Sequence, residues 1–413
     1  MQFPELLLDK SLCKVRTITT FLKFDFDQRK WPSLIEQANK FCVSLADDFK
    51  SQGYQVQSIR IVTNAFSEYI DTTNLTSAQN DLRKLNTILT HYQGSGLRLR
   101  FAIGEAKNAH ELSLIPELIK EFGDLCNVCV NIPADQHFLL DKKLIDEAVK
   151  TVRKISDVTP RGEGNFNFTV NFNCQPLIPY FPASYVDSAH TNTFVIGLET
   201  PDLLVATLKA FNSLNSTLER QTLYEGYHQA LVQQIQQHVD QLQKIIDGIE
   251  EIPYRFAGLD SSAAPSKNCA SMTEVYELMG VEYFGAAGTV EASSLLTRVF
   301  KSIKTMPLVG FSGLMLALTE DRGLAVGSHA ANFDIRALLT YSAVCGIGLD
   351  TVPIPGNTPS HKLSALMCDT GTMAFRLNKP LTVRVFPVPG LVAGDTTSFE
   401  SDDLCNCTVL AVP

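Results

Sequence analysis

The architecture of this chain is first indicated by residues 14–24, Lys14-Val-Arg-Thr-Ile-Thr-Thr-Phe-Leu-Lys-Phe24. Their β-branched and aromatic side chains predict a strand. Residues 33–52 then place apolar side chains at 34, 35, 38, 41, 42, 45, 46 and 49, which is the spacing of one helical face. Residues 55–63 again predict a strand. A strand, a helix and a second strand in this order are typical of an α/β fold with parallel strands.

The alternation of strand and helix patterns continues beyond these segments. Helices are predicted at 77–92, 110–122 and 138–156, and strands at 97–103, 125–132 and 193–199. We therefore expect one large domain over 1–413. Within it we distinguish a βα half at 1–200, a long helical segment at 201–250 and a C-terminal half at 251–413 with glycine- and proline-rich loops.

Residues 165–173, Asn165-Phe-Asn-Phe-Thr-Val-Asn-Phe-Asn173, show the clearest alternation of apolar and polar side chains in the chain. The pattern predicts a strand with an amide-rich face. That face either contacts water or lines the inside of a barrel or cleft, where it could bind a polar ligand. We favour the solvated face, because polar side chains are mostly exposed.

The segment 201–250 is expected to be helical. Its apolar side chains recur at near-heptad spacing, which permits an exposed helix or helical hairpin that serves as an oligomer seam. An amphipathic helix packed on the chain's own core is an equally good interpretation. The apolar positions are Leu231, Ile235, Val239, Leu242, Ile246 and Ile249.

Composition narrows the class of protein. The chain has 413 residues, of which 45% are hydrophobic and 19% charged, and a net charge of -9. This acidic balance without a lysine and arginine cluster argues against nucleic-acid binding. No apolar run reaches the roughly 18–20 residues of a membrane span, and the first residues lack the features of a signal peptide. We therefore expect a cytoplasmic protein whose ten cysteines are free thiols.

The segment 341–369 is rich in prolines and glycines, and it predicts a rigid, irregular loop. Cys345, Asp350 and Asn357 would lie at the mouth of this loop, where reactive groups are often found. Burial of Cys345 as a small hydrophobe is the alternative. His361 is the histidine best placed in the sequence to act as a base, although it could equally begin a surface helix.

Carboxylates gather in the turn-rich C-terminal half. If they converge, hard oxygen ligands would suit Mg²⁺, Ca²⁺ or Mn²⁺. The alternative is that they cap helices and turns. The candidate ligands are Glu320, Asp321, Asp350 and Asp369.

Arginines recur within predicted strands, and a charge there must face solvent, a salt partner or a polar cavity. Such arginines could anchor the carboxylate or phosphate of a small substrate. Salt bridges to nearby carboxylates are the alternative. The strand arginines are Arg16, Arg60, Arg100 and Arg255. The expected substrate-binding set comprises Arg16, Arg60, Arg255, Asp260, Asn357 and Arg384.

Several short segments occur in a characteristic order along the chain. They include Arg60-Ile-Val-Thr-Asn64, Phe181-Pro-Ala-Ser-Tyr185, Gly258-Leu-Asp-Ser-Ser-Ala-Ala-Pro265, Gly310-Phe-Ser-Gly313, Gly348-Leu-Asp-Thr-Val-Pro-Ile-Pro-Gly-Asn-Thr-Pro359 and Arg384-Val-Phe-Pro-Val-Pro-Gly390. Together they resemble the uncharacterised "domain of unknown function 711" family. The resemblance implies a ten-stranded α/β barrel in two halves, similar to the pyruvate formate-lyase and glycyl-radical group, with helices outside. It also implies a small ACT-domain protein as a partner, and amino-acid or carboxylate metabolism.

A glycyl-radical enzyme would need a cysteine such as Cys345 near a radical-bearing glycine such as Gly390 or Gly394. The radical enzymes carry an arginine and a tyrosine around that glycine, whereas this chain has Leu391 and Asp395. These departures argue against radical chemistry, because a shared fold does not transfer function.

Two functions are therefore expected. The first is an enzyme that acts on a small anionic metabolite, in which arginines bind the anion and Cys345, Asp350, His361, Asp395 or a divalent ion supplies the chemistry. It predicts Cys345, Asp350 and Asp395 together in a concave pocket. The second is a non-catalytic sensor or scaffold that acts with an ACT-domain partner. It predicts anchors without a paired acid and base, and an exposed apolar patch along 223–249. We also expect a homo-oligomer.

Overall fold

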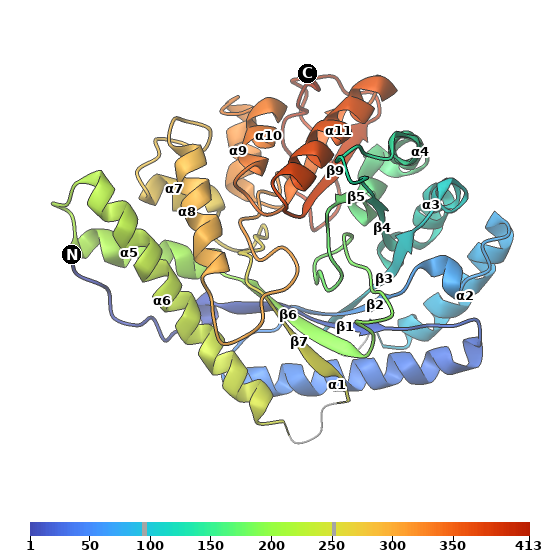
Figure 1. Ribbon diagram of the computed structural model, residues 1–413, viewed down its shortest axis with the longest axis horizontal. Coiled ribbons are helices and arrows are strands. Elements are labelled where there is room, and N and C mark those ends of the chain that lie inside the picture. Colours follow the sequence, from blue (N-terminus) through green and yellow to red (C-terminus); the bar gives the residue numbers. More distant parts are fainter. Residues whose placement is uncertain (93–96, 250–252) are drawn as a thin grey trace.

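The computed structural model describes residues 1–92, 97–249 and 253–413. These residues form a sheet of nine strands in the order β7-β6-β1-β2-β3-β4-β5-β9-β8. The strands are β1 (Lys14–Leu22), β2 (Ser58–Thr63), β3 (Arg98–Ala106), β4 (Asn127–Ile132), β5 (Phe168–Phe172), β6 (Thr193–Glu199), β7 (Arg255–Asp260), β8 (Gly348–Pro355) and β9 (Leu381–Val388). Figure 1 shows the helices around the outside of this curved sheet. The α/β class is confirmed.

The strands run in two sets of opposite direction. Strands β1 to β5 are mutually parallel, while β6 and β9 pair antiparallel with β1 and β5 at the two sides. β7 and β8 continue parallel to β6 and β9. Residues 307–319 make contact with both ends of the sheet, because Leu308 bridges Leu259 of β7 and Ala317 bridges Asp350 of β8. A closed ten-stranded barrel stays a prediction, as does the likeness to pyruvate formate-lyase.

The helices follow the strands in the expected alternation. They are α1 (Trp31–Ser51), α2 (Leu75–Thr90), α3 (Ala109–Phe122), α4 (Lys142–Val158), α5 (Pro201–Leu214), α6 (Arg220–Asp247), α7 (Met272–Leu278), α8 (Thr289–Lys301), α9 (Arg322–His329), α10 (Ile335–Ser342) and α11 (Ser360–Arg376). No helix in the described part of the chain combines the length and apolar character needed to cross a bilayer.

The two faces of the sheet differ in chemistry. Successive side chains of a strand point to opposite faces. On β2, Ile59 and Ile61 belong to the large apolar core that the helices cover, whereas Arg60 and Val62 lie on the inner face. The inner face thus carries polar and charged side chains between smaller apolar clusters, and it provides the setting for a ligand site.

The amide-rich strand is not solvated, so that prediction is wrong. β5 lies between β4 and β9, and all five of its residues are buried. Asn171 donates from Nδ2 to Asn131 Oδ1 at 3.0 Å and to the Ala183 carbonyl at 3.0 Å. The alternation of side chains is correct, but both faces of a central strand are covered by other parts of the chain.

The irregular loop predicted around residue 350 is also wrong over Gly348–Pro355, which forms β8. The register with β9 shifts between Leu349 and Val352, where Thr351 has φ of 50°. β8 is an end strand of the described sheet. Prolines are tolerated in an edge strand where the missing N–H would not have faced a ladder partner.

The helical segment after β6 packs on the chain's own core. Leu231, Ile235, Val239 and Leu242 of α6 are fully buried in the main apolar cluster. None of the described large apolar side chains in 223–249 is exposed, and residue 250 lies outside the described residues. The amphipathic interpretation is therefore correct, and the apolar stripe is not available as an oligomer seam.

The variant Ile235→Ala tests this packing. Truncating a buried isoleucine removes apolar contacts and leaves a cavity, so we expect the free energy of unfolding to fall by about 2–5 kcal/mol. Urea denaturation measures this change, and Gln233→Ala at an exposed position of the same helix is the matched control. An unchanged unfolding midpoint together with an altered sedimentation coefficient would instead show that the stripe joins two copies of the chain.

Candidate functional site

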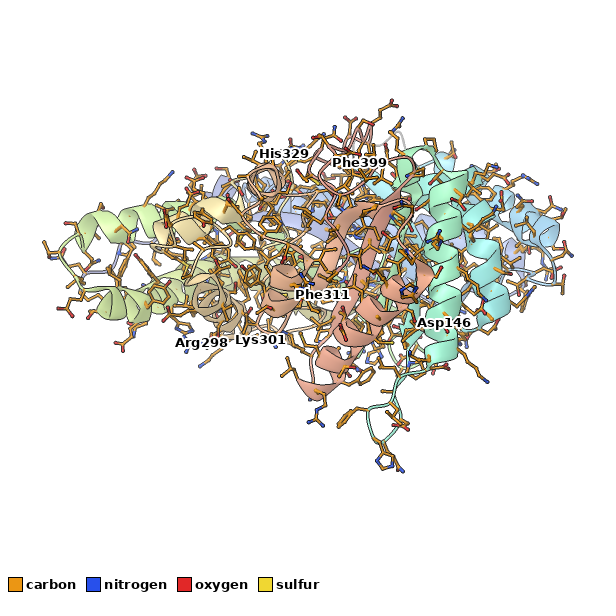
Figure 2. The ribbon with its side chains drawn as sticks, turned by 90° about the horizontal axis from the view of Figure 1, so that it is seen from above. Asp146, Arg298, Lys301, Phe311, His329 and Phe399 are labelled. Atoms are coloured by element: carbon orange, nitrogen blue, oxygen red, sulfur yellow. The ribbon has the colours of Figure 1, made fainter. Side chains whose placement is uncertain are left out.

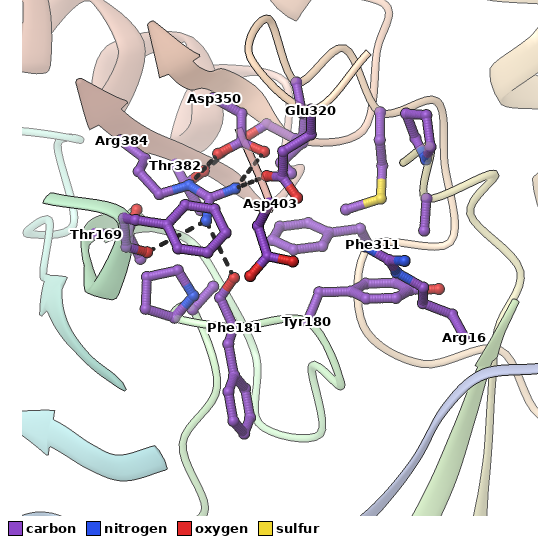
Figure 3. Close-up of a pocket in the computed structure, with 18 of the residues that line it drawn as sticks. Arg16, Thr169, Tyr180, Phe181, Phe311, Glu320, Asp350, Thr382, Arg384 and Asp403 are labelled. Carbon is purple, nitrogen blue, oxygen red and sulfur yellow. Dashed lines mark hydrogen bonds and ion pairs between the residues drawn. The ribbon is translucent and has the colours of Figure 1, made fainter. Parts of the chain in front are cut away.

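A cavity of about 60 Å³ lies on the inner face of the sheet (Figure 3). Its wall includes side chains from β1, β2, β3, β5, β8 and β9, and from the loops that carry Tyr180 and Phe311. Phe311 is buried and lies near the middle of the molecule when it is seen from above (Figure 2). The charged residues of the wall are Arg16, Arg60, Arg100, Arg384, Glu320, Asp350 and Asp403.

Strand register brings two of the arginines together. Arg60 of β2 pairs directly with Arg100 of β3, and with Thr19 of β1 on its other side. Side chains at paired positions of neighbouring strands lie on the same face and close to each other. Two like charges are therefore adjacent on the inner face, an arrangement that costs free energy unless negative charge is nearby.

Among the described residues, Arg60 is the one charged group of the cavity wall that has no oppositely charged partner. Its Nη1 donates to the Pro179 carbonyl at 3.0 Å, and its guanidinium lies 4.9 Å from the centroid of the Phe181 ring. Its Nε is buried without a hydrogen-bond acceptor, and no carboxylate of the described residues lies within 4.0 Å of it. Burial, and then the charges of Arg100 and Arg16, lower the pKa of Arg60 well below its usual value. An anion would relieve all of these costs.

Arg384, in contrast, is fully engaged. Its Nε donates to Asp350 Oδ1 at 2.6 Å, and its Nη2 donates to Asp350 Oδ2 at 3.0 Å and to Glu320 Oε1 at 2.5 Å (Figure 3). Burial opposes its charge, but the two carboxylates outweigh that effect and raise the pKa of Arg384. Burial also raises the pKa of Glu320. Arg384 thus fits the salt-bridge interpretation of the sequence better than the role of a substrate anchor.

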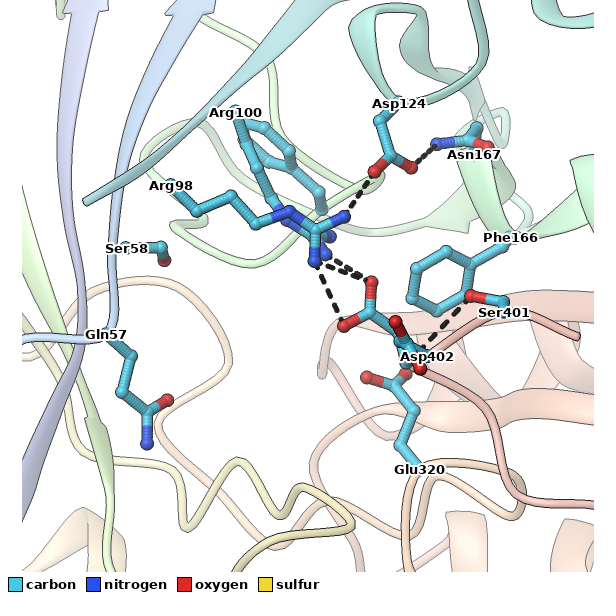
Figure 4. A network of polar contacts seen from close by, with 12 residues as sticks. Gln57, Ser58, Arg98, Arg100, Asp124, Phe166, Asn167, Glu320, Ser401 and Asp402 are labelled. Atoms are coloured by element: carbon cyan, nitrogen blue, oxygen red, sulfur yellow. Dashed lines mark hydrogen bonds and ion pairs between the residues drawn. The ribbon is translucent and has the colours of Figure 1, made fainter. Parts of the chain in front are cut away.

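The C-terminal segment contributes the carboxylate of Asp403 to the cavity (Figure 3). Figure 4 shows Arg98, Arg100 and Asp124 of the polar network beside it. Asp403 pairs with Arg100, and its Oδ2 accepts from Arg98 Nη1 at 2.9 Å. Arg98 also pairs with Asp124, which accepts a hydrogen bond from Asn167. Burial opposes ionisation of Asp403, but the charges of Arg100 and Arg98 outweigh it and lower the pKa of that carboxyl. These ion pairs hold the chain end against the sheet.

Arg16 and Asp260 have different roles at the cavity: Arg16 lines it, and Asp260 lies behind its wall. Arg16 lines the cavity and donates from Nη1 to Gln57 Oε1 at 2.8 Å and to Glu199 Oε2 at 3.3 Å. Asp260 is buried at the end of β7 and accepts from the backbone N–H groups of Phe311 at 2.8 Å and Ser312 at 3.0 Å. Burial raises the pKa of Asp260 to about 6, against the opposing effect of these hydrogen bonds. Asp260 does not line the cavity, but it fixes the loop that carries Phe311.

Several predicted site residues lie away from the cavity. Cys345 is 1% exposed and belongs to the main apolar core, where packing accounts for it. Asp395 is half-buried and accepts from the Val392 N–H at 2.8 Å. The exposed residues of this group are Arg255, Asn357, His361, Asp369, Gly390 and Gly394. The combination of Cys345, Asp350 and Asp395 is therefore not brought together, and a catalytic role for it gains no support from the geometry.

The predicted metal ligands are also dispersed. Asp321 caps α9 and accepts from the N–H groups of Gly323 and Leu324. Asp369 is exposed on α11, while Glu320 and Asp350 share Arg384. Across 1–92, 97–249 and 253–413, no three carboxylate, imidazole or thiol groups come together in a way that could hold a metal ion. These four residues therefore do not form a ligand set.

Several residues of the site were not predicted from the sequence. Tyr180, Phe181 and Phe311 lie in irregular loops without periodicity, although Phe181 and Phe311 belong to motifs that carry the family resemblance. Thr169 lies on the polar face of the alternating strand, so the rejected interpretation of that face would have found it. Asp403 has no signal in the sequence, because only the folded chain brings residues 98, 100 and 403 together.

Comparison with known proteins places the chain among uncharacterised relatives. A family model described as "Uncharacterised ACR (DUF711)" matches residues 6–401. A UPF0210 protein of Neisseria meningitidis serogroup B is 26% identical over 292 residues, which are 69% of this chain and 62% of that relative. A UPF0210 protein of Oenococcus oeni is 27% identical over 257 residues, which are 60% of this chain and 55% of that relative. A UPF0210 protein of Limosilactobacillus reuteri is 35% identical over 156 residues, which are 37% of this chain and 35% of that relative. Each match spans less than two thirds of the relative's own length.

The variant Arg384→Met tests the buried ion pairs. Removing the guanidinium leaves Asp350 and Glu320 buried without their partner, so we expect a loss of about 3–5 kcal/mol in the free energy of unfolding. Chemical denaturation measures the loss, and Arg376→Met at an exposed position of α11 is the control. A change in stability no larger than that of the control would contradict the network described here.

The contacts of Asp403 predict a pH-dependent release of the chain end. Its pKa is lowered in the folded protein, so its ionised form stabilises the fold above the usual pKa of an aspartate, about 3.9, and this contribution is lost as the pH falls through the folded-state value. We expect amide hydrogen exchange in 397–409 to accelerate below about pH 4 relative to the intrinsic rate. Asp403→Asn should show fast exchange already at pH 7. Equal protection of this segment in variant and wild type would contradict the proposed anchoring.

Proposed function

The chain belongs to the DUF711 family, and from this premise we propose that it binds a small organic anion in the cavity of its sheet and acts on it as an enzyme. The observation that carries the proposal is Arg60. A buried guanidinium beside a second arginine, without a carboxylate of the described chain in reach, is a binding site for a carboxylate or phosphate group. Arg16 and Arg100 lie on the same wall and would add to the positive potential around the ligand.

Glu320 is the best candidate for chemistry in this cavity. It lines the wall, and burial raises the pKa of its carboxyl, which is the direction that favours a carboxyl group as a general acid or base. Asp350 and Arg384 hold its position through the shared guanidinium. Proton transfer at the bound anion therefore replaces the predicted cysteine chemistry in the proposal, and a divalent metal remains an unsupported expectation.

A closed barrel is part of the same proposal. Two observations support a ten-stranded barrel in two halves, similar to the pyruvate formate-lyase group. Strands β1–β5 and β6–β9 run in opposite directions, and residues 307–319 bridge to both β7 and β8. Such closure would enclose the cavity and exclude water from it. A cytoplasmic setting is supported by the ten cysteines, all of which are unpaired.

A non-catalytic sensor is the second candidate. It is favoured by the pairing of all three carboxylates of the cavity wall with arginines, which leaves no free acid and base pair. An ACT-domain partner and a homo-oligomer belong to this candidate as proposals.

Solvent-exchange measurements in deuterated water distinguish the two functions, because only an enzyme that transfers protons would incorporate deuterium into the bound ligand. The variant Glu320→Gln should abolish that incorporation.

Anion binding is tested by calorimetric titration of sodium propionate and inorganic phosphate into the wild type and Arg60→Met. Loss of a charge-assisted hydrogen bond is worth about 1.5–3 kcal/mol, so we expect the affinity of whichever anion binds to fall about ten- to a hundredfold. Arg255→Gln, an exposed arginine outside the cavity, is the control and should bind as the wild type does. Binding that Arg60→Met leaves intact would refute the proposal.

A further inference from the structure

The wall of the cavity also indicates which kind of anion it takes. We infer that the ligand is a short-chain monocarboxylate, in which one carboxylate binds the arginines and a body of a few carbon atoms packs on an apolar wall. This inference rests on the proposed function and names its ligand class. A cavity of this kind should prefer such a carboxylate to inorganic phosphate and to zwitterionic amino acids.

The apolar wall is a cluster of buried side chains that is separate from the main core. The cluster comprises Cys174, Ile178, Tyr180, Ala183, Ala264, Phe311, Met315 and Ile347. Six of these eight residues line the cavity. Figure 3 shows Phe311 and Tyr180 between Arg16 and the Arg384 network, so charged and apolar surfaces face the same space. Apolar surface in a binding cavity favours a ligand that can cover it with carbon atoms.

The charges of the wall match one negative charge. Arg384 pairs with Asp350 and Glu320, Arg100 with Asp403 and Arg16 with Glu199, so Arg60 is the one arginine of the wall that has no carboxylate partner among the described residues. The carboxylates of Asp350, Glu320 and Asp403 are engaged by arginines. An ammonium group would therefore lack a free acceptor and would meet the repulsion of Arg60 and Arg100. A monoanion supplies the partner that Arg60 lacks, whereas the ammonium group of a zwitterion finds no free carboxylate in the wall.

The size of the cavity limits the length of the ligand. A water molecule needs about 10–15 Å³ on this measure of volume, so the cavity of about 60 Å³ takes about four to six groups of that size. A carboxylate uses three of them. The remaining space fits about one to three further carbon atoms, which corresponds to the range from acetate to butyrate.

The test is a titration series with acetate, propionate, butyrate, hexanoate, L-2-aminobutyrate and inorganic phosphate, at constant pH and ionic strength. Burial of one CH₂ group is worth about 0.8 kcal/mol, so each added carbon should tighten binding about fourfold up to butyrate. Hexanoate should bind more weakly than butyrate because it exceeds the cavity. L-2-aminobutyrate and phosphate should each bind at least about tenfold more weakly than butyrate.

Two variants connect this series to the apolar wall. Met315→Gln keeps the length of the side chain but removes its apolar character, so the gain in affinity per carbon should disappear. Ile347→Val removes one methyl group and should move the best chain length upward by about one carbon. Met373→Gln, a half-buried position on α11 that does not line the cavity, is the control for both. A series that neither wall variant changes would overturn the inference.

The outcomes also separate this inference from the proposed function. If phosphate or L-2-aminobutyrate binds at least as tightly as butyrate, and Arg60→Met abolishes that binding, anion binding stands and the short-chain carboxylate is wrong. If no anion of the series binds in a way that depends on Arg60, the proposed function itself is wrong. Chain-length dependence that requires both Arg60 and the apolar wall supports both.

Discussion

Positive charge buried on the inner face of the sheet is the constraint that organises the rest of this molecule. A guanidinium removed from water must be compensated by charge or hydrogen bonds, because its desolvation costs several kcal/mol. Asp350 and Glu320 compensate Arg384, Asp403 compensates Arg100, and Glu199 compensates Arg16. Arg60 is left with a backbone carbonyl and the face of Phe181. That difference turns one of four similar side chains into the proposed ligand anchor.

The compensation of these charges ties distant parts of the chain to the sheet. Asp403 lies near the C-terminus and pairs with arginines of β3, while Glu320 directly follows residues 307–319, which contact both sheet ends. Asp260 uses hydrogen bonds to fix the loop of Phe311. The cavity is therefore built by loops and tails that are held by charge, around strands that are held by their outer apolar core.

The sequence was informative where local periodicity governs structure. The order of strands and helices in the first half, and the presence of arginines within strands, could be predicted because burial on the outer face imposes the spacing of the apolar residues. The face of β5 and the strand β8 were predicted wrongly, since each depends on which strands lie beside it. Cys345 looked reactive in a glycine-rich segment, but its contacts are decided by packing of the main core. Pairing between residues 100 and 403 arises only from the tertiary fold.

The most direct measurement is a crystal of the protein soaked in 3-bromopropionate, in which the bromine is located by anomalous scattering. We expect one strong peak in the cavity, against Phe311 and Ile347, with the carboxylate within hydrogen-bond distance of Arg60. Bromine found only on the outer surface, or a guanidinium of Arg60 paired with a carboxylate of the chain itself, would contradict it.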